Sequence, residues 1–365
     1  MKSVELFSGI GGFRIACDEL GIDTVWANDI DDNAAKVYMD NFPGTNYFNG
    51  DINSYISEIP DHDLLTGGFP CQPFSSAGKK LGINDVRGTL FSSIVEIIKN
   101  KNPNFFVLEN VKRLLSMDNG LHFSTILNAL SSAGYFVEWR LLNAIDFGLP
   151  QNRERVIIIG WRSDFGKEKY PRMLPQKDIE NISYKQSENI RNFSTWTNFE
   201  DHRLKFKSWG CAYQGKFIDL DVKRFTMALP FKRLFEVLEE CPSENFFFNE
   251  DTIKRIKDSI KVNKYFNGVE IKYNQKGGAR MGYSIFGVNG VAPTLTSSTS
   301  RHYERYEVDG YYRRLTNIEY ARIQGFPDNH CRCVSVYDQY VLFGNAVPPI
   351  LVKWAINQLI NNENK

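Results

Sequence analysis

Short apolar runs alternate with amphipathic segments along the first 160 or so residues of the chain. Apolar runs predict strands, because a strand buried on both faces reads as a nearly continuous hydrophobic stretch. Spacings of three and four between apolar residues predict helices. The predicted strands are residues 3–7, 24–27, 63–66, 105–108 and 156–160, and the predicted helices are residues 13–20, 32–41, 90–99 and 123–133. Strands that alternate with helices indicate a doubly wound α/β domain with a mainly parallel sheet.

This regular alternation breaks down after about residue 163. Residues 164–310 mix aromatic residues, Asn, Lys and Gly, and only two helical segments stand out, near 230–240 and 250–260. Regular patterning returns after Tyr311 and ends in a predicted helix at about 349–361. We therefore predict a first domain made of residues 1–163 plus 311–365, with a smaller irregular domain, residues 164–310, inserted into it.

Composition and charge narrow the class of protein. The 365 residues are 42% hydrophobic, contain no apolar run long enough to span a membrane, and begin without a signal-peptide pattern. Six scattered cysteines are expected to be reduced thiols, so we expect a cytoplasmic protein. The net charge of +1 hides an uneven distribution: residues 1–70 hold 3 Lys/Arg and 12 Asp/Glu, whereas residues 261–314 hold 9 and 4. One face could therefore meet a polyanion, although uneven surface charge without function is an open alternative.

A glycine-rich loop follows the first predicted strand, with the sequence Leu-Phe-Ser-Gly-Ile-Gly-Gly-Phe-Arg over residues 6–14. Glycines at such a turn let the backbone approach a ligand closely. A dinucleotide fingerprint would need a third glycine where Arg14 stands, so the loop better suits a ligand without phosphates. Asp29, after the second predicted strand, could accept ribose hydroxyl protons, and Asp51 could accept from an adenine amino group. Helix capping is the alternative role for each carboxylate.

A second loop, Gly-Gly-Phe-Pro-Cys-Gln-Pro-Phe-Ser over residues 67–75, carries the strongest chemical signal. It follows a predicted buried strand, at the edge of the sheet where α/β proteins place their sites. Prolines and glycines on both sides hold Cys71 on a rigid loop, and a buried structural thiol would not need them. Thiolate is an effective nucleophile, so we predict covalent catalysis by Cys71.

The second loop resembles the nucleophile loop of the cytosine-C5 DNA methyltransferases of bacterial restriction-modification systems. Other blocks of that family follow in the family's order and cover residues 1–160 and 311–365. The matching blocks are residues 6–14, 85–91, 109–111 (Glu-Asn-Val), 151–155 (Gln-Asn-Arg-Glu-Arg), 313–328, Tyr340 and 344–349 (Gly-Asn-Ala-Val-Pro-Pro).

The resemblance implies a fold, a reaction and partners. The fold would be that of the class I S-adenosylmethionine-dependent methyltransferases, with an inserted target-recognition domain. The reaction would be site-specific transfer of a methyl group from S-adenosyl-L-methionine to C5 of a cytosine flipped out of duplex DNA. It would pass through a covalent bond between Cys71 and C6, release S-adenosyl-L-homocysteine and need no metal. We expect a monomer that binds double-stranded DNA and is functionally paired with a cognate restriction endonuclease.

The resemblance also assigns roles to single residues. Cys71 would be the nucleophile, Glu109 would assist at N3 of the cytosine, and Arg155 would contact O2. Arg153 and Asn110 would support the catalytic loops, and surface salt bridges are the alternative role for either arginine. The predicted cofactor residues are Phe7, Gly9, Gly11, Asp29, Asp51, Ile52, Pro70, Leu90 and Asn345.

Residues that contact DNA are expected near the nucleophile and in glycine-rich or hydroxyl-rich loops of the inserted domain. They are Gln72, Ser75, Ser76, Lys276, Gly277, Gly278, Arg280, Thr296 and Arg301. A solvated linker is the alternative for the loops of the inserted domain.

Two other functions remain open. A tRNA-modifying branch that methylates C5 of cytosine in RNA resembles the DNA enzymes, but the long variable region favours duplex DNA. A catalytically inactive DNA-binding homologue is the second alternative, and the presence of Cys71, Glu109 and Arg155 argues against it. A metal site at residues 330–333 (His-Cys-Arg-Cys) lacks a second ligand pair, so we predict none.

Overall fold

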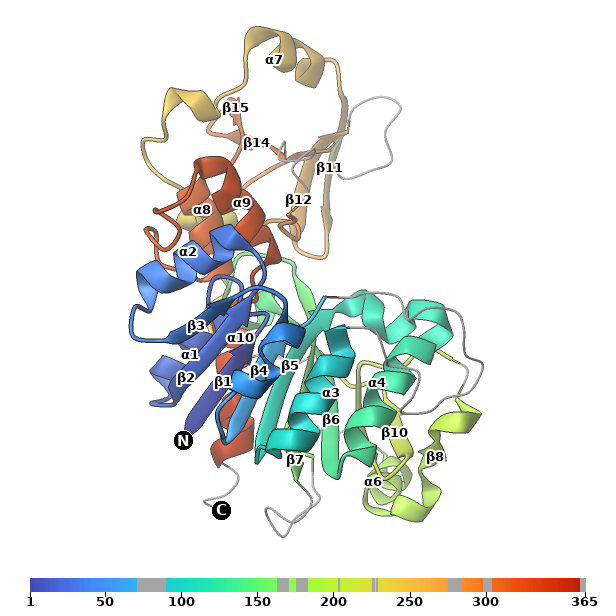
Figure 1. Ribbon diagram of the computed structural model, residues 1–365. Coiled ribbons are helices and arrows are strands. Elements are labelled where there is room, and N and C mark those ends of the chain that lie inside the picture. Colours follow the sequence, from blue (N-terminus) through green and yellow to red (C-terminus); the bar gives the residue numbers. More distant parts are fainter. Residues whose placement is uncertain are drawn as a thin grey trace.

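The computed structural model describes residues 1–70, 90–162, 171–174, 183–202, 204–224, 227, 229–274, 284–297 and 304–361. Its largest element is a ten-stranded sheet in the order β3-β2-β1-β4-β5-β7-β6-β9-β10-β8 (Figure 1). The strands are β1 (Lys2–Leu6), β2 (Asp23–Asp29), β3 (Asn46–Asn49), β4 (Leu64–Gly68), β5 (Phe105–Val111), β6 (Tyr135–Asn143), β7 (Glu154–Arg162), β8 (Thr197–Asn198), β9 (Trp209–Tyr213) and β10 (Lys216–Leu220).

Strand direction in this main sheet changes partway across it. β3, β2, β1, β4 and β5 are parallel neighbours. β7 lies antiparallel between β5 and β6, and β9, β10 and β8 follow in antiparallel pairs. Consequently β1 to β6 and β10 run one way, and β7, β8 and β9 run the other. The predicted α/β fold is confirmed, and the sheet is mixed: seven of its ten strands run in one direction, although only four of its nine neighbouring pairs are parallel.

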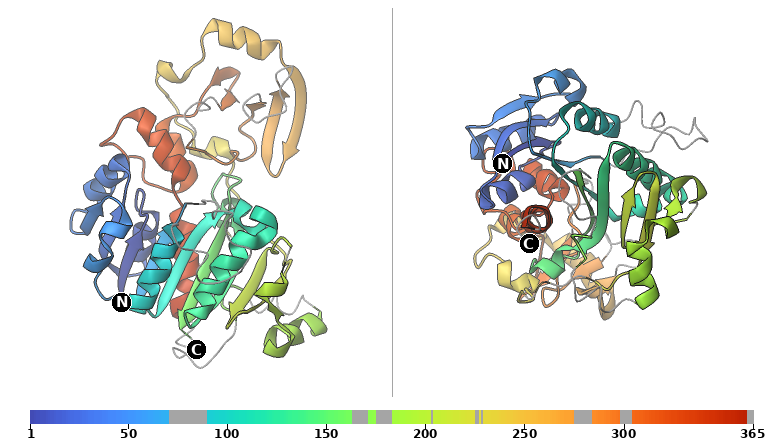
Figure 2. Two further views of the ribbon diagram at one scale, coloured as in Figure 1. Left: turned by 45° about the vertical axis from the view of Figure 1, so that its right-hand side comes forward. Right: turned by 90° about the horizontal axis from the view of Figure 1, so that it is seen from below.

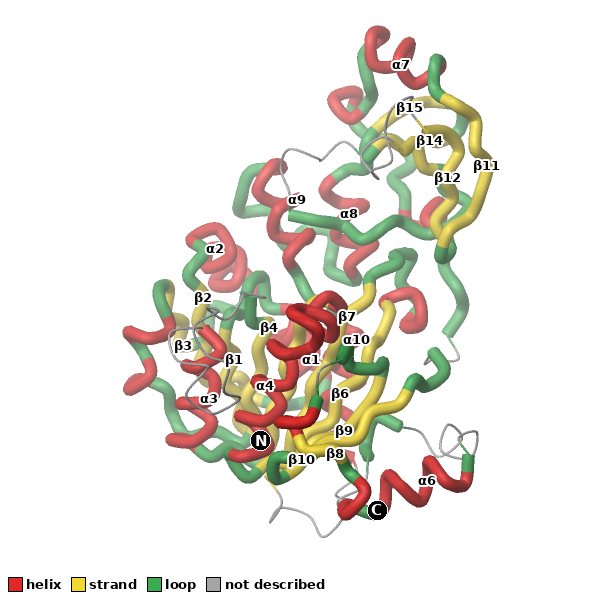
Figure 3. Tube along the Cα trace, turned by 90° about the vertical axis from the view of Figure 1, so that its right-hand side faces the viewer, coloured by secondary structure: helices red, strands yellow, loops and turns green. Residues whose placement is uncertain are grey.

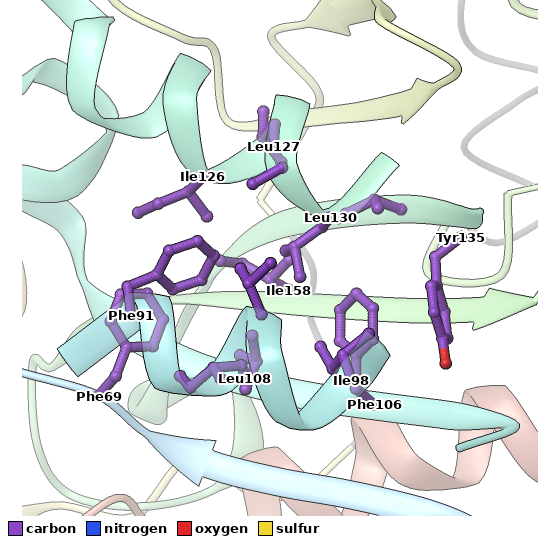
Figure 4. Packing of buried hydrophobic residues seen from close by; sticks show 14 of the residues in the cluster. Phe69, Phe91, Ile98, Phe106, Leu108, Ile126, Leu127, Leu130, Tyr135 and Ile158 are labelled. Carbon is purple, nitrogen blue, oxygen red and sulfur yellow. The ribbon is translucent and has the colours of Figure 1, made fainter. Parts of the chain in front are cut away.

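Helices cover both faces of the main sheet (Figures 1 and 2). α3 (Leu90–Lys101) and α4 (Leu121–Ser132) pack on one face, and α1 (Gly12–Glu19) and α10 (Pro349–Ile360) on the other, while α2 (Asp32–Asn41) lies beside β2 and β3. Successive side chains of a strand point to opposite faces, so Phe106 and Leu108 of β5 join α3 and α4. Figure 4 shows this cluster, with Phe106, Leu108 and Ile158 of the sheet against Ile98, Ile126, Leu127 and Leu130.

All nine predicted elements before residue 163 are present, but β3 and β6 were not predicted. β6 was missed because Glu138 and Arg140 interrupt its apolar run. Both side chains are nevertheless buried. Glu138 accepts hydrogen bonds from Trp209 Nε1 at 2.7 Å and from Met173 N at 3.0 Å, which offset the cost of burying a carboxylate.

The second sheet has the order β11-β12-β13-β14-β15 and lies at the top of Figure 1, and Figure 3 shows the two sheets as separate groups of strands. Its strands are β11 (Ile260–Phe266), β12 (Val269–Asn274), β13 (Ser284–Phe286), β14 (Arg305–Val308) and β15 (Tyr311–Arg313). The remaining helices are α6 (Tyr184–Arg191), α7 (Glu250–Lys257), α8 (Asn317–Gln324) and α9 (Val336–Asn345). Within the described residues, no helix combines the length and apolar character needed to cross a membrane.

The strand pairing indicates where the inserted domain begins and ends. β8, β9 and β10 fall in the expected inserted domain, residues 164–310, yet they extend the main sheet through the β6–β9 pair. β15 begins at Tyr311, in the expected first domain, yet it pairs with β14 of the second sheet. We therefore propose that the inserted domain begins after Leu220 and ends after Arg313.

Candidate active site

A cavity of about 460 Å³ opens at the carboxyl ends of β1, β2, β4 and β5. Its volume lies in the range typical of small-molecule sites, roughly 300–1,000 Å³. The lining holds four carboxylates, Asp29, Asp31, Asp51 and Glu109, and one basic side chain, Arg155. Four negative charges and one positive charge leave an excess of three negative charges, so the cavity favours a cationic ligand.

The turn from β1 into α1 forms one wall of the cavity. Phe7 and Gly9 take positive φ angles of 52° and 53°, and Gly11 caps α1 with φ 84°. A Cβ on Gly11 would lie 2.4 Å from a ring carbon of Phe42, and one on Gly12 would lie 2.4 Å from the carbonyl oxygen of Val347. Both positions therefore require glycine, although Gly12 lines the cavity and Gly11 does not.

Two of the predicted carboxylates shape the adjoining wall. Asp29 Oδ2 accepts a hydrogen bond from Gly9 N at 2.7 Å, which ties β2 to the glycine loop, and burial raises the pKa of Asp29. Asp51 caps the 3-10 turn Ile52–Ser54 and also lines the cavity, so capping and ligand contact are compatible there. The cap of α2 is Asp31 and not Asp29.

The lining includes eight of the nine predicted cofactor residues. They are Phe7, Gly9, Asp29, Asp51, Ile52, Pro70, Leu90 and Asn345. Asn28 was missed, although a polar residue at the end of an apolar strand could have been found in the sequence. Its Nδ2 donates to the carbonyl oxygens of Phe48 at 2.8 Å and Gly50 at 2.9 Å, which fixes the turn that presents Asp51.

Glu109 and Arg155 form an ion pair at the cavity wall, with 2.7 Å between Oε1 and Nε. Only 13% of the Glu109 side chain and 10% of the Arg155 side chain are exposed. They come together because β5 and β7 are neighbours in the sheet. Burial lowers the pKa of Arg155, and the Glu109 carboxylate opposes that shift. Pro70, directly before Cys71, lines the same cavity.

Asn110 and Arg153 hold backbone segments and do not contribute charge to the cavity. Asn110 Nδ2 donates to Phe69 O at 2.9 Å, next to the loop that carries Cys71. Arg153 is fully buried and absent from the lining, and it donates hydrogen bonds to three carbonyl oxygens. The structure therefore brings Glu109 and Arg155 together at the cavity and directs Arg153 away from it.

Several predicted residues lie outside the described residues: Cys71, Gln72, Ser75, Ser76, Lys276, Gly277, Gly278, Arg280 and Arg301. Thr296 is described and exposed, and its backbone lies against Gly344. In the described part of the chain, no group of three His, Cys, Asp or Glu residues could hold a metal ion. His330, from the candidate metal motif, instead places Nε2 2.7 Å from Ile10 O and so supports the glycine loop.

A family model and several known proteins resemble the chain, most of them over nearly its whole length. The family model of the C-5 cytosine-specific DNA methylases matches residues 1–361. Type II methyltransferase M.HaeII of Haemophilus aegyptius is 33% identical over 100% of this chain and 94% of that protein. M.HhaI of Haemophilus parahaemolyticus is 30% identical, with 95% of this chain and 90% of that protein covered. M.NgoBI of Neisseria gonorrhoeae is 52% identical over 44% of this chain and 50% of that protein.

Solved structures give the same fold. The S. pombe Dnmt2 methyltransferase superposes with a TM-score of 0.63 at 16% identity, covering 100% of both chains. The Entamoeba histolytica methyltransferase EhMeth gives a TM-score of 0.62 at 16% identity, covering 100% of this chain and 99% of that chain. At this identity the likeness is one of fold, and it confirms the predicted methyltransferase architecture. The match over residues 1–361 identifies the chain as a member of the C-5 cytosine-specific DNA methylase family.

Proposed function

We propose that this DNA cytosine-5 methyltransferase takes its methyl group from S-adenosylmethionine bound in the cavity, and that Cys71 attacks the target cytosine. One observation carries the proposal: the Glu109–Arg155 pair and Pro70, the residue before Cys71, line one wall of the acidic cavity. A donor in the cavity would therefore lie next to the groups that act on the base.

The residues of the cavity fit this donor. When bound, S-adenosylmethionine supplies an electrophilic methyl group on a positively charged sulfur. The excess of acidic side chains suits that charge, and the carboxylates of Asp29 and Asp51 at the cavity wall could accept further hydrogen bonds from ribose hydroxyls or the adenine amino group. Ile52, Leu90 and Phe7 supply apolar surface for a purine ring.

The chain's own residues would perform the activation of the base. The Cys71 thiolate would add to C6, and the electrons of the C5–C6 double bond would move toward C5 and the N3–O2 side of the ring. Arg155 would donate to O2, and Glu109, carrying a proton, would donate it to N3 and so neutralise the negative charge that develops there. After methylation of C5, a base would remove the C5 proton and the Cys71 sulfur would leave C6, which restores the double bond.

The DNA substrate would be read by the inserted domain. A cytosine stacked in a duplex cannot present C6 to a thiolate, so we infer that it is flipped into the site. Lys261 and Lys264 on the exposed strand β11 are suited to phosphate contacts. The likeness to type II methyltransferases supports a role beside a cognate restriction endonuclease.

Covalent trapping tests the reaction. Purified protein is incubated with S-adenosylmethionine and a pool of duplexes that contain 5-fluorocytosine, and the product is analysed by mass spectrometry. Fluorine at C5 cannot be removed in the way that a proton can. The final elimination of Cys71 is therefore blocked, and a working enzyme stays covalently bound to its DNA. We expect an adduct with the wild-type protein and none with Cys71→Ser, and sequencing the trapped DNA gives the recognition site.

The same assay distinguishes the alternatives. An adduct on fluorinated RNA but not on DNA would favour an RNA methyltransferase. DNA binding without any adduct, in a protein that still binds the donor, would indicate an inactive homologue and contradict the mechanism.

A further inference from the structure

Three fully buried polar side chains, Gln151, Arg153 and Gln324, form a cluster that we call the junction cluster. It lies where the loop before β7 meets the end of α9 and residues 292–297, which we call the recognition segment because they come from the proposed inserted domain. Buried polar groups are costly unless they are paired, so each contact in this cluster constrains the segments that it joins.

Arg153 bridges two segments that have different roles. Its Nη1 donates to Leu295 O at 2.8 Å in the recognition segment. Its Nη2 donates to Gly344 O at 2.9 Å and to Ala346 O at 2.8 Å. Gly344, Asn345 and Ala346 all line the donor cavity, whereas no residue of the recognition segment does. One guanidinium therefore holds the cavity wall and the recognition segment together.

The glutamines of the junction cluster complete the connection. Gln151 Oε1 accepts from Leu295 N at 3.1 Å, and Gln151 Nε2 donates to Gln324 Oε1 at 3.0 Å. Both backbone polar groups of Leu295 are thus bound by the cluster. Thr294 Oγ1 also donates to Asn152 O at 2.6 Å. The recognition segment is therefore anchored to the loop before β7 at several points.

The recognition segment and the cavity wall also touch directly. A Cβ on Gly344 would lie 2.4 Å from the carbonyl carbon of Thr296 and 2.5 Å from Ser297 N. The two backbones are therefore in close contact at this point. Because packed segments this close cannot move independently, a shift of one changes the position of the other.

We propose that Arg153 is a positioning residue that couples the donor cavity to the recognition segment. Binding of the donor orders residues 344–346, and Arg153 transmits that order to Leu295 through charge-assisted hydrogen bonds in a buried environment. By thermodynamic reciprocity, DNA that orders the recognition segment favours binding of the donor. This inference rests on the proposed function, because it takes S-adenosylmethionine as the ligand of the cavity.

Hydrogen exchange measured by mass spectrometry tests the coupling without DNA or catalysis. The probe is S-adenosylhomocysteine, added to the full chain. In the wild-type protein we expect exchange to slow in residues 7–12, at the cavity, and by about fivefold or more in residues 292–297. In Arg153→Lys, which keeps the charge but loses the forked donor, we expect slowing at residues 7–12 and less than about twofold change at 292–297.

Arg140→Lys is the matched control. Arg140 is also fully buried and donates to the carbonyl oxygens of Met173 and Lys223, but those partners belong neither to the cavity wall nor to the recognition segment. Lysine there should destabilise the protein similarly and still leave the slowing at residues 292–297. If Arg153→Lys does not fold, Thr294→Val removes the hydrogen bond to Asn152 O and should reduce the same effect.

The outcomes separate the two proposals. Slowing at residues 7–12 without any at 292–297 in the wild-type protein would overturn the coupling and leave the donor site intact. Retention of the full effect in Arg153→Lys would also overturn it. If S-adenosylhomocysteine slows exchange nowhere, the assignment of the donor fails and the coupling inference fails with it.

Discussion

β5 in the main sheet and β11, at the edge of the second sheet, are buried to very different extents. In β5 of the main sheet, Phe105 to Leu108 are completely buried. In β11 of the second sheet, every residue except Val262 is exposed, and Tyr265 and Phe266 are 61% and 64% exposed. We propose that the main sheet forms a rigid platform for a small ligand and reacting groups, whereas β11 of the second sheet offers exposed side chains to a large partner.

The difference between β5 and β11 indicates which part of the molecule needs fixed atomic positions. Hydrogen-bond and ion-pair distances of 2.7 Å at Asp29 and Glu109 depend on strands that cannot shift, because buried packing on both faces fixes their register. Reading DNA requires reach and adaptable contacts, which a strand exposed at Lys261, Lys264 and Tyr265 can provide. Four experiments test this division of roles, in order of decreasing expected effect.

Glu109→Gln should give the largest change. Loss of the carboxyl group next to the target cytosine is expected to lower kcat by a factor of about 10² to 10⁴, which is the typical contribution of general acid–base catalysis. Binding of S-adenosylhomocysteine should change little, and steady-state methylation kinetics give the measurement. Glu154→Gln is the control, because Glu154 pairs with the exposed Lys112 and lies outside the cavity. Equal losses of kcat in the two variants would contradict the assignment.

Phe106→Ala and Phe266→Ala compare the two sheets directly. Phe106 is completely buried, so its truncation should lower the free energy of unfolding by about 3–5 kcal/mol. Phe266 is 64% exposed, and its truncation should change stability by less than about 0.5 kcal/mol. Urea denaturation followed by circular dichroism provides both values. Similar losses of stability would show that Phe266 contributes packing that its exposure does not reveal.

Asp29→Asn should weaken the donor site without affecting DNA. Charged hydrogen bonds contribute roughly 1.5–3 kcal/mol, so affinity for S-adenosylhomocysteine should fall about tenfold or more in calorimetric titration. Affinity for duplex DNA, measured by fluorescence anisotropy without the donor, should stay within about twofold, because Asp29 lines the cavity and lies outside the proposed inserted domain. A loss of DNA affinity as large as the loss of donor affinity would contradict this separation of roles.

Glu5→Gln probes a buried acid in the main sheet. Tyr38 Oη donates to Glu5 Oε2 at 2.8 Å, and burial raises the pKa of Glu5 to about 8. The folded state therefore holds a proton that the unfolded state releases above its ordinary pKa. This contribution to stability is fully present below the ordinary pKa and is lost as pH rises toward 8.

In the wild-type protein, the free energy of unfolding should accordingly fall by up to about 1.4 kcal/mol per pH unit between pH 5 and 8. Glu5→Gln cannot ionise, so its slope should be smaller by that amount. Urea titrations at several pH values in this interval measure both slopes. Identical slopes for the two proteins would mean that Glu5 does not hold its proton.

Much of the candidate site could be predicted from local sequence rules. Side chains that follow successive parallel strands meet at one edge of the sheet, which is why Gly9, Asp29 and Glu109 could be assigned to one cavity. Gly11 does not line the cavity, and its lack of a side chain serves backbone conformation and packing against Phe42, so its contact with the cofactor stays a prediction. The predicted role of Cys71 remains a prediction, because it lies outside the described residues.

The sequence by itself determined the alternation of strands and helices, the glycine loop and the residues at the strand ends. Each of these depends on neighbours within a few positions, so periodicity and turn chemistry reveal it. Only the tertiary structure decided that β8 to β10 extend the main sheet and that Arg153 points to the junction cluster. Those outcomes depend on partners such as Leu295, far away in the sequence, whose positions are fixed only when the chain packs.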